Sequence, residues 1–110
     1  MKNTSADYQQ IFCERLKSAR LTKGLSQKRL GILAGIDEFV ASTRINRYEK
    51  GVHQANIDIL HQLAAALDVP VAYFYADDDE LATLLMHWKQ MTRHVKTEII
   101  ALCHADKESD

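Results

Sequence analysis

The chain has 110 residues, of which 46% are hydrophobic and 26% charged, with four glycines and one proline. This balance is typical of a small globular domain and excludes a disordered chain. No apolar run approaches the ~20 residues that a membrane span needs, and the first residues lack the apolar core of a signal peptide. We therefore expect a cytoplasmic protein with no membrane partner. The scarcity of glycine and proline favours an all-α fold.

The formal net charge of −1 hides an uneven distribution along the chain. Residues 1–76 carry ten Lys or Arg against seven Asp or Glu, whereas residues 77–110 carry four against eight. A basic body beside an acidic tail is typical of a nucleic-acid-facing module joined to a segment that faces something else. We expect a first domain over residues 1–76 and a separate C-terminal segment over residues 77–110.

Apolar spacings of three and four residues predict a series of helices in the first domain. They cover Tyr8–Arg20, Gln27–Ala34, a third segment ending near Tyr48–Gly51, then Ile57–Leu67 and Val71–Tyr75. Asp7, Ser26 and Asn56 stand just before three of these helices and are good N-caps. Gly24 follows the first helix, where a left-handed residue commonly ends one, and Pro70 precedes the last.

The stretch Leu25–Gly51 is predicted to contain a helix, a turn and a second helix. An α-helix fits the ~12 Å major groove of duplex DNA. A preceding helix, packed across it through a tight turn, fixes its angle. Ala34 and Gly35 are both small, which we attribute to a close approach of the two backbones at the turn.

The last part of the chain begins with four acids, Asp77–Glu80, and continues with apolar residues at helical spacing. The pattern predicts one long amphipathic helix of about seven turns at ~3.6 residues each. Its apolar residues are Leu81, Leu84, Leu85, Trp88, Met91, Val95, Ile99 and Leu102. Either this helix folds back to complete the core of the monomer, or it pairs with its copy in a homodimer. Trp88 is a natural anchor in the second case.

An ordered series of short motifs runs from the first helix to the fifth. It comprises Arg15–Arg20, Leu25–Gln27, Leu30, Ala34–Ile36, Ile45, Arg47–Gly51, Ile57–Val69 and Val71–Tyr75. With these motifs, residues 12–75 resemble the Cro/C1-type, or XRE, family of phage-repressor helix-turn-helix proteins. The resemblance implies a five-helix phage-repressor-like domain, here followed by the long C-terminal helix. The segment between Gly35 and Ile45 is about four residues, close to one helical turn, longer than in the family. A longer turn near Asp37–Val40 or an extra helical turn is therefore expected.

The resemblance implies a sequence-specific regulator of transcription, expected to be a repressor, that binds a palindromic double-stranded DNA operator as a homodimer. It places the base-reading side chains at Ser42, Thr43, Arg44, Asn46 and Arg47. Arg47 is the first candidate for guanine, whereas Arg44 is either a second reader or a phosphate clamp. The candidate phosphate contacts are Gln27, Lys28, Lys50, His53 and Gln54. Glu49 is expected to accept a bond from within the domain, with Arg15 as its suggested partner.

Catalytic and metal-binding patterns are not recognisable in the sequence. His87 and His94 share a helical face, but two histidines without a carboxylate make a poor zinc site. We expect no enzyme activity, no cofactor and no metal. Cys13 and Cys103 lie far apart and are expected to be reduced thiols. Two alternatives remain: an antitoxin-like module that binds another protein, and a regulator that senses a ligand or oxidant through one of these cysteines.

Overall fold

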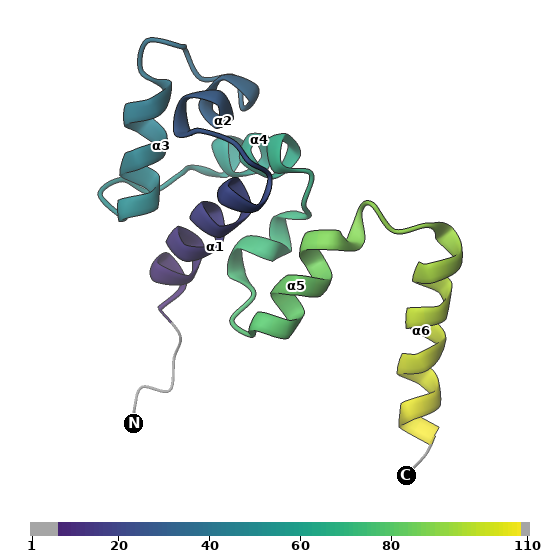
Figure 1. Cartoon of the computed structure of the whole chain (residues 1–110). Helices are drawn as coiled ribbons and strands as arrows, with labels where there is room; N and C mark the ends of the chain where they lie inside the picture. The colour runs from purple at the N-terminus through teal and green to yellow at the C-terminus, as the bar shows by residue number, and fades with distance from the viewer. Residues whose placement is uncertain (1–6, 109–110) are drawn as a thin grey trace.

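The computed structural model describes residues 7–108, with side chains to residue 105. In it the chain folds into six α-helices and one short 3₁₀ helix (Figure 1). They are α1 (Tyr8–Thr22), α2 (Gln27–Leu33), α3 (Ala41–Lys50), α4 (Ile57–Leu67), η1 (Val71–Tyr75), α5 (Asp79–Trp88) and α6 (Arg93–Glu108). The described part of the chain contains no strand, and the expected all-helical fold is confirmed. Within it, no helix has both the length and the apolar character that a membrane crossing requires.

The helix ends follow the capping residues that the sequence predicts. Asp7, Ser26 and Asn56 have extended backbones, and the side chain of each accepts a hydrogen bond from the backbone N–H three residues further on. Gly24 after α1 and Gly51 after α3 have φ angles of 71° and 75°, in the left-handed region. These residues satisfy the free backbone groups at the helix ends and fix where each helix starts or stops.

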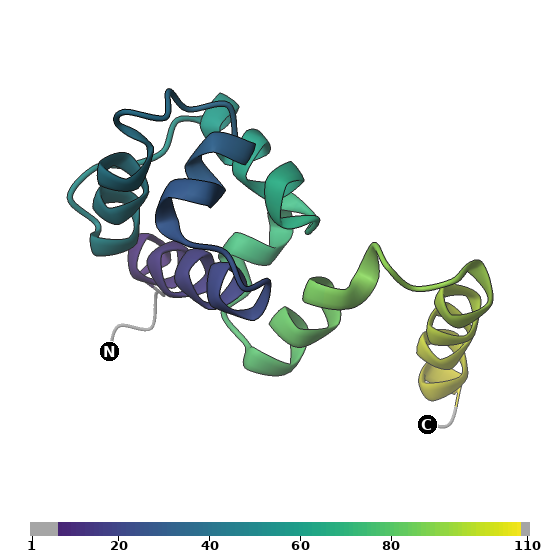
Figure 2. The same ribbon diagram turned by 45° about the horizontal axis from the view of Figure 1, so that its top comes forward.

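A single core lies between α1, α2, α3, α4, η1 and α5. Its largest fully buried side chains are Leu16, Leu30, Ile45, Leu63, Leu67, Val69, Tyr73 and Phe74. The rings of Phe12 and Phe74 pack with their centroids 5.2 Å apart, which joins α1 to η1. Helix α5 adds Ala82 and Met86 to the same core. Figure 2 shows α1 to α5 gathered around this core.

The helices α2 and α3 approach each other closely where they cross. A Cβ atom added to Gly31 would lie 2.6 Å from the Cβ of Ala41. Gly35 has no such neighbour, because the nearest atom to an added Cβ would be the Oε1 of Gln62 at 3.8 Å. The expectation of a close approach at Ala34–Gly35 was therefore wrong, because the close approach lies about one helical turn earlier, at Gly31. Gly35 has a φ of 86°, so a positive φ, and not crowding, explains that glycine.

The extra residues between α2 and α3 form a turn and do not lengthen α3. The backbone N–H of Phe39 donates to Oδ1 of Asp37 at 2.8 Å, and that of Val40 donates to the Asp37 carbonyl at 3.1 Å. Helix α3 then begins at Ala41. Of the two expected forms of this segment, the structure has the longer turn.

The structure corrects the expectation of one continuous helix at the C-terminal end. The chain leaves the helical path after Trp88 and starts α6 at Arg93. The hydroxyl of Thr92 accepts a bond from the N–H of Val95 at 3.2 Å, as an N-cap does. The side-chain amide of Gln90 donates to both the carbonyl and the carboxylate of Asp68, at the end of α4. A cap and a tertiary bond therefore break a helix that apolar spacing alone would continue.

Helix α6 stands apart from the other helices in both views (Figures 1 and 2). One contact joins it to α5, where the Nζ of Lys96 lies 5.4 Å from the ring centroid of Trp88. The radius of gyration of 16.0 Å exceeds the ~13 Å expected for a compact chain of this length. The projection of α6 from the other helices contributes to this excess.

Candidate nucleic-acid interface

Helix α3 has one face in the core and the other in solvent. Ala41, Ile45 and Tyr48 are buried, which holds the helix against α1 and α2. The opposite face is exposed and carries Ser42, Thr43, Asn46, Arg47 and Lys50. Four of the five predicted base-reading residues therefore lie on one accessible surface, together with one predicted phosphate contact.

Arg44, the fifth predicted reader, lies at the side of α3 and is partly buried. Its Nη2 donates to the hydroxyl of Tyr48 at 2.6 Å, and its guanidinium carbon lies 5.8 Å from the centroid of that ring. A guanidinium held this way has fewer free donors for the bidentate contact with guanine. The arrangement separates Arg44 from the exposed row that contains Arg47.

Two predicted DNA contacts from different helices meet in the structure. The side-chain amide of Gln27, the first residue of α2, donates to Oδ1 of Asn46 at 3.2 Å and to Oε1 of Glu49 at 3.1 Å. The sequence places Gln27 and Asn46 in two separate groups, one for phosphates and one for bases. The structure joins them into a continuous polar surface from the start of α2 to α3.

A buried ion pair fixes α3 against α1, and its partner is not the one that the sequence suggested. Nε of Arg20 lies 2.6 Å from Oε2 of Glu49, and Nη2 lies 3.1 Å from Oε1. The side chains are only 11% and 4% exposed, respectively. Arg15 instead pairs with Asp79 and donates to the carbonyl of Ala76, which ties α1 to the start of α5. The suggested Arg15–Glu49 contact was therefore wrong: the true partner of Glu49 lies little more than one helical turn further along α1.

The remaining predicted phosphate contacts flank the exposed face of α3. Lys28 is exposed on α2, one residue after Gln27. His53 and Gln54 are exposed in the loop that follows α3. The N–H of His53 donates to the carbonyl of Arg47 at 3.4 Å, which keeps this loop close to the helix. Exposed polar side chains are thus available on α2 and in the loop that follows α3.

The apolar residues predicted for pairing are divided between two helices. Leu81, Leu84, Leu85 and Trp88 lie on α5, with Leu85 packed partly against the core. Met91 lies in the linker, and Val95, Ile99 and Leu102 lie on α6. Val95 and Leu102 are 41% and 67% exposed. Leu81 on α5 is 44% exposed, so the predicted apolar residues that stay open lie on both helices, with Leu102 on α6 the most exposed.

Neither cysteine belongs to a recognisable reactive centre. The thiol of Cys13 donates to the carbonyl of Tyr48 at 3.2 Å. Burial raises the pKa of this thiol, with a further contribution from the charge of Asp7, so the reactive thiolate is disfavoured. Cys103 is exposed on α6. Over the described residues, no three His, Cys, Asp or Glu side chains are grouped to hold a metal.

The short helix α2, the crossing at Gly31 and the exposed face of α3 together define a helix-turn-helix protein. The family model described as Helix-turn-helix matches residues 16–74, more than half of the chain. The chain therefore belongs to this family of DNA-binding regulators, in its XRE-type branch.

Similar proteins agree with this assignment. The crystal structure of the transcriptional regulator BswR matches with a TM-score of 0.78 and 44% identity, over 84% of this chain and 92% of that one. Uncharacterized HTH-type transcriptional regulators from Sinorhizobium medicae and Rhizobium meliloti are each 33% identical over 63 residues, or 57% of this chain. The match spans only 42% of the length of these two relatives.

Proposed function

We propose that this chain binds a specific double-stranded DNA site and represses transcription there, with α3 in the major groove. The observation that carries the proposal is the exposed row on α3, while the other face of the same helix is anchored in the core. The row consists of Ser42, Thr43, Asn46 and Arg47. Repression is the simplest outcome, because occupancy of a site near a promoter is enough to block transcription. A regulator of chromosomal DNA in bacteria acts in the cytoplasm.

Within this row, Arg47 has the best chemistry for reading a base. Its planar fork matches the O6 and N7 acceptors of guanine, and its side chain is exposed and free of the ring contact that holds Arg44. Gln27, Lys28, Lys50, His53 and Gln54 surround the row, and we assign them to the phosphate backbone. The first turn of α2 adds backbone N–H groups and the positive end of the helix dipole.

We further propose that two copies associate through α6. An isolated helix of about 15 residues is marginally stable in water, so most helices depend on tertiary packing. Helix α6 packs closely on no other described helix, and Val95, Ile99 and Leu102 form an apolar stripe along it. A two-fold dimer would cover this stripe and present two recognition helices to a palindromic site.

Selection of bound duplexes from random DNA, followed by salt titration, tests DNA binding directly. We expect a palindromic site. Arg47→Ala should cost roughly 1–3 kcal/mol and relax one base position, while Lys50→Ala should weaken all sequences alike and reduce the salt slope by about one. Equal loss on all sequences for Arg47→Ala would contradict its role as a reader. Failure to enrich any sequence would overturn the proposal.

The oligomeric state tests the second part. The double variant Val95→Asp/Leu102→Asp should sediment as a monomer and bind the selected site more weakly. Ile57→Asp is the matched control, because Ile57 is also exposed but lies at the start of α4. If the wild-type chain is itself monomeric, the dimer is wrong.

The exposed stripe on α6 also fits a second candidate function, that of an antitoxin-like module that binds another protein. In that case the wild-type chain would stay monomeric alone, and the same double variant would lose the heterologous partner. A sedimentation measurement on the purified chain separates the two candidates.

A further inference from the structure

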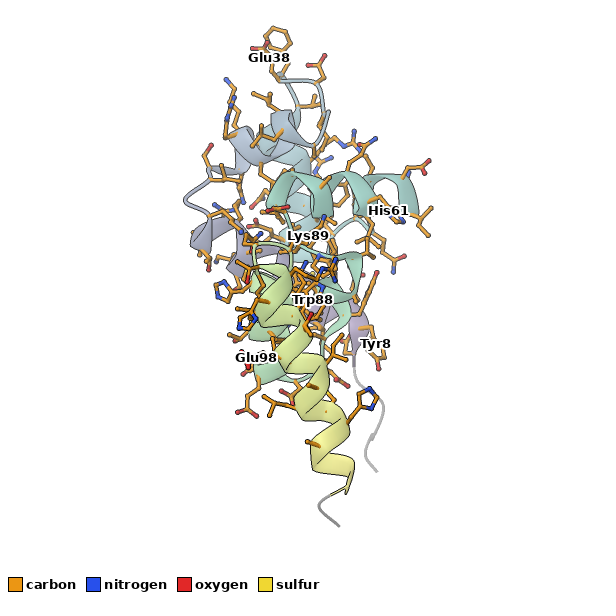
Figure 3. The ribbon with its side chains drawn as sticks, turned by 90° about the vertical axis from the view of Figure 1, so that its right-hand side faces the viewer. Tyr8, Glu38, His61, Trp88, Lys89 and Glu98 are labelled. Atoms are coloured by element: carbon orange, nitrogen blue, oxygen red, sulfur yellow. The ribbon has the colours of Figure 1, made fainter. Side chains whose placement is uncertain are left out.

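Phe39 is the most exposed large apolar residue among those described, at 89%. It lies on the turn Asp37–Val40, two residues before the first residue of α3. Figure 3 shows its neighbour Glu38 at the end of the molecule opposite α6. A copy paired through α6 would therefore leave Phe39 uncovered, and the fold offers no internal reason for a large ring at this position.

The turn that carries Phe39 is a defined structure. Asp37 accepts the backbone N–H of Phe39 at 2.8 Å and, through its carbonyl, that of Val40 at 3.1 Å. These bonds explain the carboxylate of Asp37 as a local cap. Of the two exposed apolar side chains in the turn, Val40 is 44% exposed, whereas the ring of Phe39 is almost entirely in solvent. The backbone that carries the ring is thus fixed before binding, which limits the conformational freedom lost on contact with a ligand.

The turn also lies where a recognition helix meets DNA. In helix-turn-helix complexes, the N-terminal residues of the second helix contact base edges in the major groove. Ser42 and Thr43 occupy those positions in α3, and Phe39 precedes them by about one helical turn. The apolar group that the major groove offers is the C5-methyl of thymine, which makes contacts with apolar side chains such as Phe.

We propose that Phe39 is a specificity-determining residue that packs on a thymine methyl group next to the bases read by Ser42 and Thr43. The contact rests on the proposed function, since it requires α3 to lie in the major groove. Such a contact reads a base without hydrogen bonds. It gives the lengthened turn a function of its own.

The test replaces each thymine of the selected site in turn by uracil, which lacks only the methyl group. For the wild-type chain we expect one position per half-site at which uracil lowers the affinity about fourfold. This is the effect of one buried CH₂-sized group at ~0.8 kcal/mol, with 1.4 kcal/mol per factor of ten. Phe39→Ala should bind both duplexes equally, at the affinity of the wild type for the uracil duplex or lower.

Leu21→Ala is the matched control, because Leu21 is also an exposed apolar residue but lies near the end of α1. It should keep the full preference for thymine. Unchanged melting temperatures of both variants establish that the fold is intact. A wild-type chain indifferent to uracil at every position, or a Phe39→Ala variant that keeps the wild-type preference, overturns the contact alone. Failure to select any duplex overturns the proposed function and the contact with it.

Discussion

Gly31 and Ala41 touch where α2 crosses α3, with only 2.6 Å between the Cβ of Ala41 and the place that a Cβ on Gly31 would take. Gly31→Ala should therefore destabilise the protein, although alanine is the better helix former. Overpacking costs about 1–3 kcal/mol, and the upper part of this range applies here because two of the three nearest atoms belong to the backbone. This cost exceeds the gain of ~1 kcal/mol in helix propensity. Urea denaturation followed by circular dichroism measures the difference.

The double variant Gly31→Ala/Ala41→Gly is the control for that mechanism, because it removes the closest atom, the Cβ at 2.6 Å, and leaves only the Cα and carbonyl oxygen of residue 41 at 3.0 and 3.1 Å. It should recover part of the lost stability despite the cost of a glycine in α3. If the double variant is less stable than the sum of its single changes, the clash is not the cause.

The Arg20–Glu49 pair, in which both side chains are buried, should contribute more to stability than the Arg15–Asp79 pair, in which the carboxylate is exposed. Glu49→Ala leaves the guanidinium of Arg20 buried without its partner, which costs about 3–5 kcal/mol. Asp79→Ala should have little effect, because its side chain is 96% exposed. Thermal melts of the two variants compare the pairs directly. Similar losses for both would show that burial does not decide their strength.

Arg44 should act on affinity and not on sequence preference. Because its guanidinium is held by Tyr48, we expect Arg44 to contact a phosphate and not a base. Arg44→Ala should therefore weaken binding to all duplexes alike and reduce the salt slope by about one. Arg47→Ala should instead relax one position. Binding assays on the selected site and its single-base variants measure both effects. A loss of affinity at one base position only for Arg44→Ala would show that Arg44 reads a base.

Removing α6 should leave the body folded. The core lies between Phe12 and Met86, so a chain that ends at Met91 should have a free energy of unfolding within about 0.5 kcal/mol of the wild type. The same truncation should abolish self-association and weaken binding to a palindromic duplex. Loss of cooperative unfolding would mean that α6 also stabilises the body.

Cys13 should react more slowly than Cys103 with iodoacetamide. Burial raises the pKa of the Cys13 thiol, so the folded chain holds this proton at pH values where the unfolded chain releases it. Its alkylation should accelerate as the pH rises, with a midpoint above that of the denatured protein. Mass spectrometry of the two peptides follows both rates. Preferential modification of Cys13 over Cys103 in the folded chain would revive an oxidant-sensing role for it.

Much of the body follows from local rules that the sequence displays. Asp7, Ser26 and Asn56 each precede an apolar repeat, so the starts of three helices could be predicted. The outward side of α3 follows only in part: the apolar residues Ile45 and Tyr48 are buried, whereas Val40, just before the helix, is exposed. The resemblance to a known family then supplied the positions of the candidate readers.

The features that escaped prediction depend on contacts between distant segments. The partner of Glu49 is Arg20 and not Arg15, which depends on the angle at which α1 meets α3. The bond from Gln90 to Asp68 joins two residues 22 positions apart and helps to break the C-terminal helix. Thr92 is a local sign of that break, because its hydroxyl caps the start of α6.

The separation of α6 from the body has a consequence for the response of a promoter. If α6 is covered only when two copies associate, the concentration of the DNA-binding dimer rises with the square of the free monomer concentration. Small changes in synthesis or degradation would then produce a steeper change in promoter occupancy than a one-copy regulator gives.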